Sequence, residues 1–224
     1  MSKAISFIKL DFITVKPYLT LKSLLILAVA AMIMLFNSDS APLVTGFVMV
    51  FGALYVSYPF AVGEKNGIDS LYATLSISRD TVVLGRYLFA LVANIGSGAL
   101  AYAVLFVLSV VLNKDFNAAE TVLVILVMLA VYSSVQAFQL PMYFKLGYAK
   151  AKVLAYLPYV AWPLAVLSFA SLLKNDKTME FLLDLPLWIN GHFIAFCAIC
   201  ALIWFAFMFI SYRIALVCYK KRDF

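Results

Sequence analysis

The stretch VVLGRYLFALVANIGSGALAYAVLFVLSVVL, residues 82–112, decides the fold class. It has no charged residue after Arg86, and it is longer than the ~20 apolar residues that one helix needs to cross a bilayer. The rest of the chain has the same character, because 66% of its 224 residues are hydrophobic and only 12% are charged. Soluble domains have about 45–50% apolar and about 25% charged residues. A chain of this length cannot bury so much apolar surface in water, so the sequence predicts an all-α membrane protein.

Other long apolar runs predict six transmembrane helices in a single domain that covers residues 1–224. The spans are placed near residues 21–36, 42–61, 82–112, 121–143, 153–173 and 192–218. Ahead of them, residues 2–16 are predicted to form an amphipathic helix on the membrane surface. Its apolar residues Ile5, Ile8, Phe12 and Val15 recur at helical spacing among lysines. A partly disordered tail is the alternative for this segment.

The distribution of basic residues predicts which side each loop faces. Most of the 17 Lys and Arg residues fall on one side of the predicted spans, and the other side receives only Lys114, Lys174 and Lys177. Cytoplasmic loops carry the excess of Lys and Arg, so we expect a multi-pass protein of the plasma membrane with both termini in the cytoplasm. The same placement accounts for the net charge of +6, so no nucleic-acid partner is expected.

Enzymatic and metal-site patterns are missing from the sequence. It has no GxxxxGK[ST] phosphate-binding loop, no HExxH and no GxSxG. The single histidine, His192, has no cluster of ligands near it, and Cys197 and Cys200 lie in an apolar run that suits packing better than metal or redox chemistry. We therefore expect no metal, no cofactor in this chain and no catalytic residues. An intramembrane hydrolase is disfavoured.

The inner loop between the second and third predicted spans is the most informative segment. Ile68, Leu71, Tyr72 and Leu75 follow helical spacing and predict a short helix with one apolar face. Asn66 can cap its start, with Asp69 three residues later, and Ser78 can cap a further helix that begins at Arg79. Such a helix can lie on lipid headgroups or contact another protein. The charged residues of this segment favour a partner, with local salt bridges as the alternative; they are Glu64, Lys65, Asp69, Arg79 and Arg86.

Polar side chains inside the predicted spans have two interpretations. Asn94 and Ser97 lie in the third span, and Gln136 and Gln139 lie in the fourth. Such groups avoid lipid, so they are expected either to form hydrogen bonds between helices or to line a substrate path. No ionisable group lies near the middle of a predicted span, which disfavours ion-coupled transport.

Two inner segments resemble small ABC-2-type permeases. EKNGIDSLYATLSISR, residues 64–79, followed by VVLGRY, residues 82–87, is similar to the first inner loop of that family. LPMYFKLGYAKAK, residues 140–152, resembles the second inner loop, with Lys145, Lys150 and Lys152. The plan of six spans extends the resemblance over nearly the whole chain. The sequence departs from the family pattern at Ser76, where proline is common, and at Gly63, where an acidic residue is frequent.

The resemblance implies a permease that works with separate ATP-binding subunits. Two permease chains, expected as a homodimer, would join two ATPase subunits that hold ATP and magnesium. The helix at residues 66–75 would be the coupling helix, and the residues implied in coupling are Glu64, Lys65, Asn66, Ile68, Asp69, Leu71, Tyr72, Leu75 and Arg79. Within the family the chain is similar to exporters of phenol-soluble modulins and antimicrobial peptides of Gram-positive bacteria. Drug efflux and a non-transporting immunity or scaffold role are the alternatives.

Overall fold

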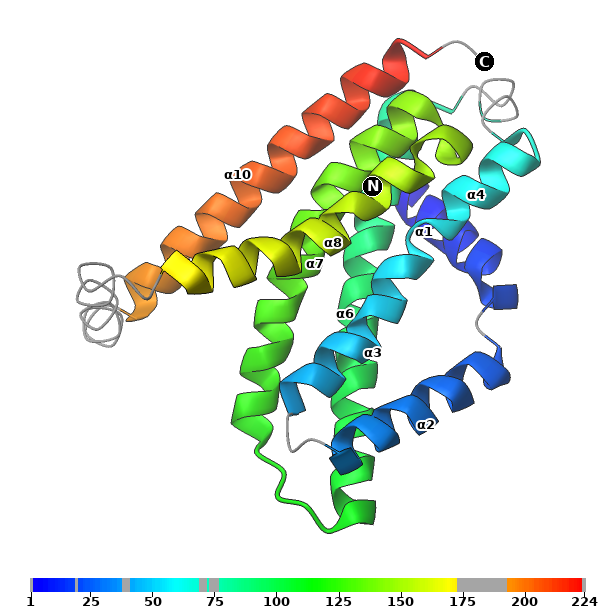
Figure 1. Ribbon diagram of the computed structural model, residues 1–224. Coiled ribbons are helices and arrows are strands. Elements are labelled where there is room, and N and C mark those ends of the chain that lie inside the picture. Colours follow the sequence, from blue (N-terminus) through cyan, green and yellow to red (C-terminus); the bar gives the residue numbers. More distant parts are fainter. Residues whose placement is uncertain are drawn as a thin grey trace.

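The structure is a computed structural model that describes residues 2–18, 20–37, 41–68, 72, 77–172 and 193–222, and every regular element in these ranges is a helix (Figure 1). The first part of the chain contains α1 (Ser2–Val15), the short 3-10 helix η1 (Lys16–Tyr18), α2 (Leu21–Asn37), α3 (Ala41–Tyr55) and α4 (Tyr58–Lys65). The long helices follow as α6 (Arg79–Leu112), α7 (Ala118–Leu146), α8 (Tyr148–Leu172) and α10 (Phe193–Lys220).

Helices α6 and α7 run antiparallel and form the centre of the bundle (Figure 1). The hydroxyl of Ser78 accepts a hydrogen bond from the Thr81 N–H, so the predicted cap of the helix at Arg79 is confirmed. At its other end α6 stops at Asn113, which has a φ of 51° in the left-handed region that asparagine tolerates. The Asn117 side chain then caps α7 by accepting from the Glu120 N–H.

The predicted span at residues 42–61 is divided into α3 and α4. The chain leaves the helical path at Val56 and Ser57, and Pro59 follows in the first turn of α4. Proline has no N–H, so the helical bond from residue 59 back to the Tyr55 carbonyl cannot form. The Ser57 hydroxyl donates to the Leu54 carbonyl at 2.8 Å and satisfies one carbonyl at the break. A proline in the last part of an apolar run therefore ends one helix and starts another.

Four stretches of the described chain are helical, long and apolar enough to cross a membrane. They are residues 41–65, which contain α3 and α4, residues 79–112, residues 118–146 and residues 198–220. A shorter apolar helix covers Leu25–Phe36 within α2, and α8 covers most of the predicted fifth span. The structure therefore supports a multi-pass membrane protein, and the number of six spans stays a prediction.

One end of the bundle gathers the start of α6 and the end of α10, with α1 beside them, and the chain's C-terminus lies there too (Figure 1). The opposite end holds the turn between α6 and α7, where Lys114 donates to the Leu35 carbonyl at the end of α2. We call the first of these the basic end, because nearly all the described lysines and arginines belong to segments that begin or end there. Lys114 is the exception among the described basic residues.

The bundle has two main hydrophobic clusters, one toward each end. The cluster away from the basic end joins α2, α3, α6 and α7 around residues such as Val48, Met49 and Leu105. Helices α3 and α6 approach closely here, since a Cβ added at Gly52 would lie 2.3 Å from the Ser97 Cβ. A small residue at position 52 is therefore what allows this contact. The other cluster, at the basic end, includes part of the candidate site.

Candidate functional site

Glu64 joins the end of α4 to the start of α8. Its carboxylate accepts hydrogen bonds from the backbone N–H groups of Tyr148 and Ala149, the second at 3.1 Å. These are N–H groups of the first turn of α8, which have no partner within the helix, and the positive end of the helix dipole favours the carboxylate. Gly147, with a φ of 78°, makes the sharp turn between α7 and α8 and leaves room for the carboxylate, because an added Cβ would lie 2.9 Å from the Glu64 Oε2. The structure thus brings the two predicted inner loops together.

Arg79 makes the matching connection to α10. Its guanidinium donates to the backbone carbonyls of Tyr219, at 3.0 Å, and of Lys220. These carbonyls lie at the C-terminal, negative end of α10, so the positive charge is favourable there. Asp80 adds an exposed ion pair with the Lys220 ammonium at 3.1 Å. The segment between α4 and α6 is therefore held at both ends. Glu64 connects its beginning to α8, and Arg79 connects its end to α10.

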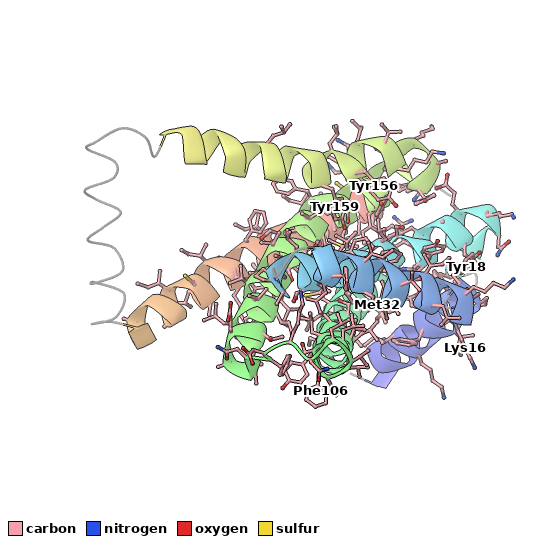
Figure 2. The ribbon with its side chains drawn as sticks, turned by 60° about the horizontal axis from the view of Figure 1, so that its bottom comes forward. Lys16, Tyr18, Met32, Phe106, Tyr156 and Tyr159 are labelled. Atoms are coloured by element: carbon pink, nitrogen blue, oxygen red, sulfur yellow. The ribbon has the colours of Figure 1, made fainter. Side chains whose placement is uncertain are left out.

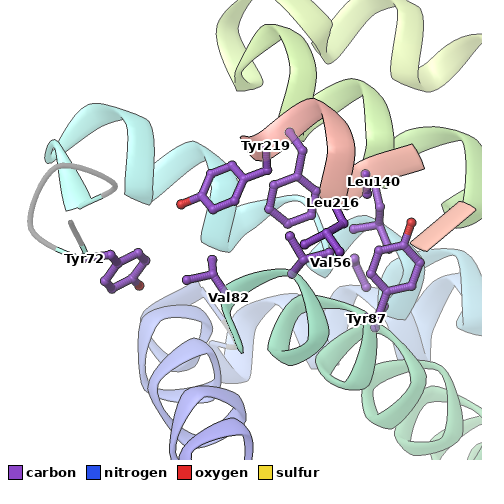
Figure 3. Close-up of a cluster of buried hydrophobic side chains, with 11 residues drawn as sticks. Val56, Tyr72, Val82, Tyr87, Leu140, Leu216 and Tyr219 are labelled. Carbon is purple, nitrogen blue, oxygen red and sulfur yellow. The ribbon is translucent and has the colours of Figure 1, made fainter. Parts of the chain in front are cut away.

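Tyr72 lies inside the protein rather than on an outer face of that segment (Figure 3). Its side chain is 4% exposed and belongs to the cluster that includes Val82, Leu216 and Tyr219. Ile68 packs against the same cluster. Asn66 ends α4, and its N–H bonds back to the Val62 carbonyl. The predicted coupling residues Asp69, Leu71 and Leu75 lie outside the described residues.

Five exposed side chains at this end form a set that we call the inner rim. It is made of the end of α4 and the turn between α7 and α8, which Glu64 holds together. Its residues are exposed and all but one carry a positive charge; they are Lys65, Asn66, Lys145, Lys150 and Lys152. A basic, solvent-exposed rim can attract an acidic protein surface or anionic headgroups.

The buried ion pair between Asp11 and Arg86 joins the surface helix to α6. The carboxylate and guanidinium are 2.7 Å apart, with exposed fractions of 1% and 5%. Arg86 also donates to the Pro59 carbonyl at 3.3 Å and lies 4.8 Å from the centre of the Phe60 ring. Burial raises the pKa of Asp11 to about 6, and the charge and hydrogen bond of Arg86 oppose that shift. The sequence analysis did not predict this pair. The sequence does contain a signal for it, because Asp11 is the one acid in the predicted surface helix, which has several lysines, and Arg86 lies at the start of an apolar span.

Asn94 and Gln136 form a reciprocal pair between α6 and α7. The Asn94 amide donates to the Gln136 Oε1 at 2.7 Å, and the Gln136 amide donates to the Asn94 Oδ1 at 2.9 Å. Both side chains are 1% exposed. Ser133 lies 3.4 Å from the Asn94 amide on the same face of α7. Two predicted path residues therefore bond to each other in the described state.

Gln139 and Ser97 are also buried and bonded. The Gln139 amide donates to the Ala155 carbonyl of α8 at 2.7 Å, and the Ser97 hydroxyl donates to the Asn94 carbonyl of its own helix at 2.8 Å. Nearby, Tyr156 and Tyr159 point from α8 toward the rest of the bundle (Figure 2). The Tyr156 hydroxyl lies 3.4 Å from the Ser57 hydroxyl at the break between α3 and α4. Polar contacts thus connect α8 to α7 and to this break.

Pro141 creates a further polar connection that the sequence analysis did not identify. It lies inside α7 and has no N–H, so the carbonyl of Ala137 loses its helical partner. The Ser211 hydroxyl on α10 donates to that carbonyl at 2.6 Å, and the Tyr87 hydroxyl on α6 lies 2.6 Å from the Ser211 oxygen. Membrane helices tolerate proline when a neighbouring helix satisfies the freed carbonyl in this way. The signal in the sequence is a proline in one span and a lone serine in another.

Within the described residues, no group of three or more His, Cys, Asp and Glu side chains lies close enough to hold a metal ion. Cys200 and Cys218 are free thiols. His192 lies outside the described residues.

Comparison with known proteins identifies the family. The family described as "ABC-2 family transporter protein" matches residues 6–220, which is nearly the whole chain. No curated protein and no solved structure matches it. The match covers the polar contacts of α6 and α7 and both sides of the inner rim. This chain of apolar helices therefore belongs to the ABC-2 transporters, a family of membrane transport proteins that generally work with an ABC ATPase.

Proposed function

We propose that the chain is the membrane subunit of an ATP-driven exporter. The observation that carries the proposal is the family match over residues 6–220, in a chain whose sequence has no phosphate-binding loop of its own. Energy would come from a separate ATPase subunit that holds ATP and magnesium. Two permease chains, as a homodimer, would assemble with two ATPase subunits.

We propose that the ATPase docks at the basic end. The segment from Asn66 to Leu75 would act as the coupling helix, and the inner rim would contact the ATPase beside it. The internal bonds of Glu64 and Arg79 support this proposal, because they tie the edges of the segment to α8 and α10. A force on the segment would then act on several helices at once. The buried Tyr72 would anchor the segment to the core rather than touch the ATPase.

The proposed orientation places the basic end and both termini in the cytoplasm of a plasma-membrane protein. Its support is the concentration of lysine and arginine at that end, compared with Lys114 at the other end of the described chain. A cytoplasmic basic end is also where a soluble ATPase can reach the inner rim.

The proposed cargo is an amphipathic or hydrophobic peptide, similar to phenol-soluble modulins. The substrate path would pass the polar side chains Asn94, Ser97, Gln136 and Gln139 between the central helices. Because Asn94 and Gln136 bond to each other in the described state, their contact with cargo requires this pair to open during the cycle. The aromatic and apolar surface around them suits an apolar peptide face better than a strongly polar solute.

Co-purification from native membranes in mild detergent tests the assignment. We expect the tagged chain to retain an ATP-binding protein, and we expect Lys65→Glu with Lys150→Glu to weaken that retention at least tenfold, because both charges on the rim are reversed. The matched control is Ala118→Glu with Ala119→Glu, which adds acidic charge to exposed positions at the opposite end. Yield in washed membranes and a reporter fused to the C-terminus verify insertion and orientation in each variant.

The outcomes separate the candidate functions. Retention of an ATPase by the wild type and the control, but not by the rim variant, supports the permease and its docking site. Stimulation of ATP hydrolysis by amphipathic peptides, and not by small hydrophobic cations, supports peptide export over drug efflux. If a well-folded, abundant chain retains no ATPase, the exporter assignment fails and an immunity or scaffold role replaces it.

A further inference from the structure

An apolar cavity of about 300 Å³ lies between α1, α2, α3 and α6. Its lining is almost entirely hydrophobic and includes Val15, Leu27, Phe51 and Phe89. Gly96 lines its exposed edge, and a Cβ added there would meet no atom within 4 Å. The volume is at the lower end of the range for small-molecule sites, about 300–1,000 Å³. The cavity therefore has room for a slender apolar group.

The cavity is elongated along the membrane helices. Its lining on α6 runs from Phe89 to Leu100, which corresponds to roughly 16 Å at 1.5 Å per residue. On α3 it runs from Val48 to Tyr55. An extended hydrocarbon chain fits this shape better than a compact ring system does.

A second, shallow hollow of about 410 Å³ lies on the surface of α1 and the start of η1. Phe12 borders both, and the second hollow is also lined by Ile8, Lys9, Ile13 and Lys16. Figure 2 shows Lys16 at the edge of the molecule, on the side where α1 leads into α2. The apolar cavity and the surface with the two lysines therefore meet at Phe12.

The charges at this surface are unbalanced. Lys9, Lys16 and the nearby Lys22 are exposed, and in the described part of the chain none of them has an acidic side chain within ion-pair distance. The one acid of α1 with a described side chain, Asp11, is buried and paired with Arg86. Negative charge is therefore favoured on this surface, beside the shared residue Phe12, and positive charge is disfavoured there.

We propose that this cavity binds one acyl chain of an anionic phospholipid, whose headgroup lies against Lys9 of α1 and Lys16 of η1. The apolar cavity selects a hydrocarbon chain, and the unpaired ammonium groups select a negatively charged headgroup. A bound lipid would fill the space between α1 and the central helices and hold the surface helix against α3 and α6. This inference does not depend on the proposed ATPase or cargo, because a lipid site needs neither.

Native mass spectrometry of the purified chain tests the site with two probes of equal acyl length, phosphatidylglycerol and phosphatidylcholine. We expect phosphatidylglycerol to bind at least tenfold more tightly. Lys9→Gln with Lys16→Gln should weaken phosphatidylglycerol binding by roughly fivefold per lysine and leave phosphatidylcholine unchanged. Gly96→Leu should weaken both probes at least tenfold, because its side chain occupies the cavity. The matched control, Ala103→Leu, adds the same group to an exposed position of the same helix and should change neither.

Three results would overturn the proposal. Equal binding of both lipids, unaffected by the lysine variant, would remove the role of the headgroup. Wild-type lipid binding in Gly96→Leu would show that the acyl chain lies elsewhere. Displacement of phosphatidylglycerol by a cationic amphipathic peptide, with one peptide replacing one lipid, would assign the cavity to cargo instead. None of these measurements requires an ATPase, so their failure leaves the proposed transport function untouched.

Discussion

Ser211→Ala tests how α10 is held to the centre of the bundle. The Ser211 hydroxyl donates to the Ala137 carbonyl that Pro141 leaves free, and it lies 2.6 Å from the Tyr87 hydroxyl. Leaving a buried polar group without its partner costs about 1–3 kcal/mol. Hydrogen bonds between membrane helices average about 0.6 kcal/mol and reach about 1.7 kcal/mol. With two bonds removed, we expect Ser211→Ala to lower the free energy of unfolding by about 1–3 kcal/mol.

Ser211→Ala in a Pro141→Ala background measures how much of the stabilisation by Ser211 depends on the carbonyl that the proline leaves free. Alanine at 141 restores a backbone N–H that can donate to the Ala137 carbonyl, so the cost of Ser211→Ala should fall by about 0.5–1.5 kcal/mol. The assay is unfolding in mixed micelles of rising SDS fraction, followed by circular dichroism. A cost of Ser211→Ala that is equal in the two backgrounds would refute the argument that Ser211 replaces the missing helical bond.

Ser134→Ala is the matched control for this cycle. The Ser134 hydroxyl donates to the Ala130 carbonyl of its own helix at 2.8 Å, and this carbonyl keeps its helical N–H partner as well. Its removal should therefore change the free energy of unfolding by less than about 0.5 kcal/mol.

Three further outcomes follow from the contacts of the central helices. Asn94→Leu leaves the Gln136 amide buried without its partner, so it should lower the free energy of unfolding in SDS by about 1–3 kcal/mol. The double variant with leucine at both 94 and 136 should recover most of that loss. Gly52→Ala should lower the free energy of unfolding by about 1–3 kcal/mol, because the added Cβ would lie 2.3 Å from the Ser97 Cβ. Adding Ser97→Gly to the same chain should restore stability. A double variant that stays as unstable as Gly52→Ala would contradict the steric argument. Burial raises the pKa of Asp11 from 3.8 to about 6. Between these two pH values the Asp11 carboxyl keeps its proton in the folded protein and loses it in the unfolded chain. The free energy of unfolding of the wild type relative to Asp11→Asn should therefore fall by on the order of 2 kcal/mol as the pH rises from 4 to 6. Thermal melts measure this difference. A melting temperature of the wild type that rises relative to the variant over that range would contradict the assignment.

The sequence predicts the longest helices well because each is a long apolar run, and the starts of α6 and α7 are also capped by local chemistry. The serine before Arg79 is an example, since a cap depends only on neighbours three residues away. The division of the second predicted span was missed, although Pro59 is visible in the sequence. An apolar run reports that a segment prefers lipid, but it does not report whether one helix or two fill it.

The polar contacts of the candidate site were harder to predict because their partners are distant in the sequence. Asp11 lies in the predicted surface helix, yet its side chain is buried against Arg86, 75 residues away. Glu64 and Arg79 were assigned to a coupling surface, and the structure shows them bonded to the ends of α8 and α10. Periodicity tells which face of a helix is polar, but it does not tell whether that face meets water, lipid or another helix.

Helix α6 carries a polar or close contact to four of the helices that surround it, α1, α3, α7 and α10. Arg86 bonds to α1, Asn94 to α7 and Arg79 to the end of α10, while Ser97 touches α3 at Gly52. The start of α6 follows directly on the segment between α4 and α6. A displacement of that segment would therefore reach the neighbouring helices through these contacts, of which those of Arg86 and Asn94 are buried. The helical bonding of the chain is already interrupted at the break around Ser57 and at the turn around Gly147, so the chain can change direction there without losing further helical bonds.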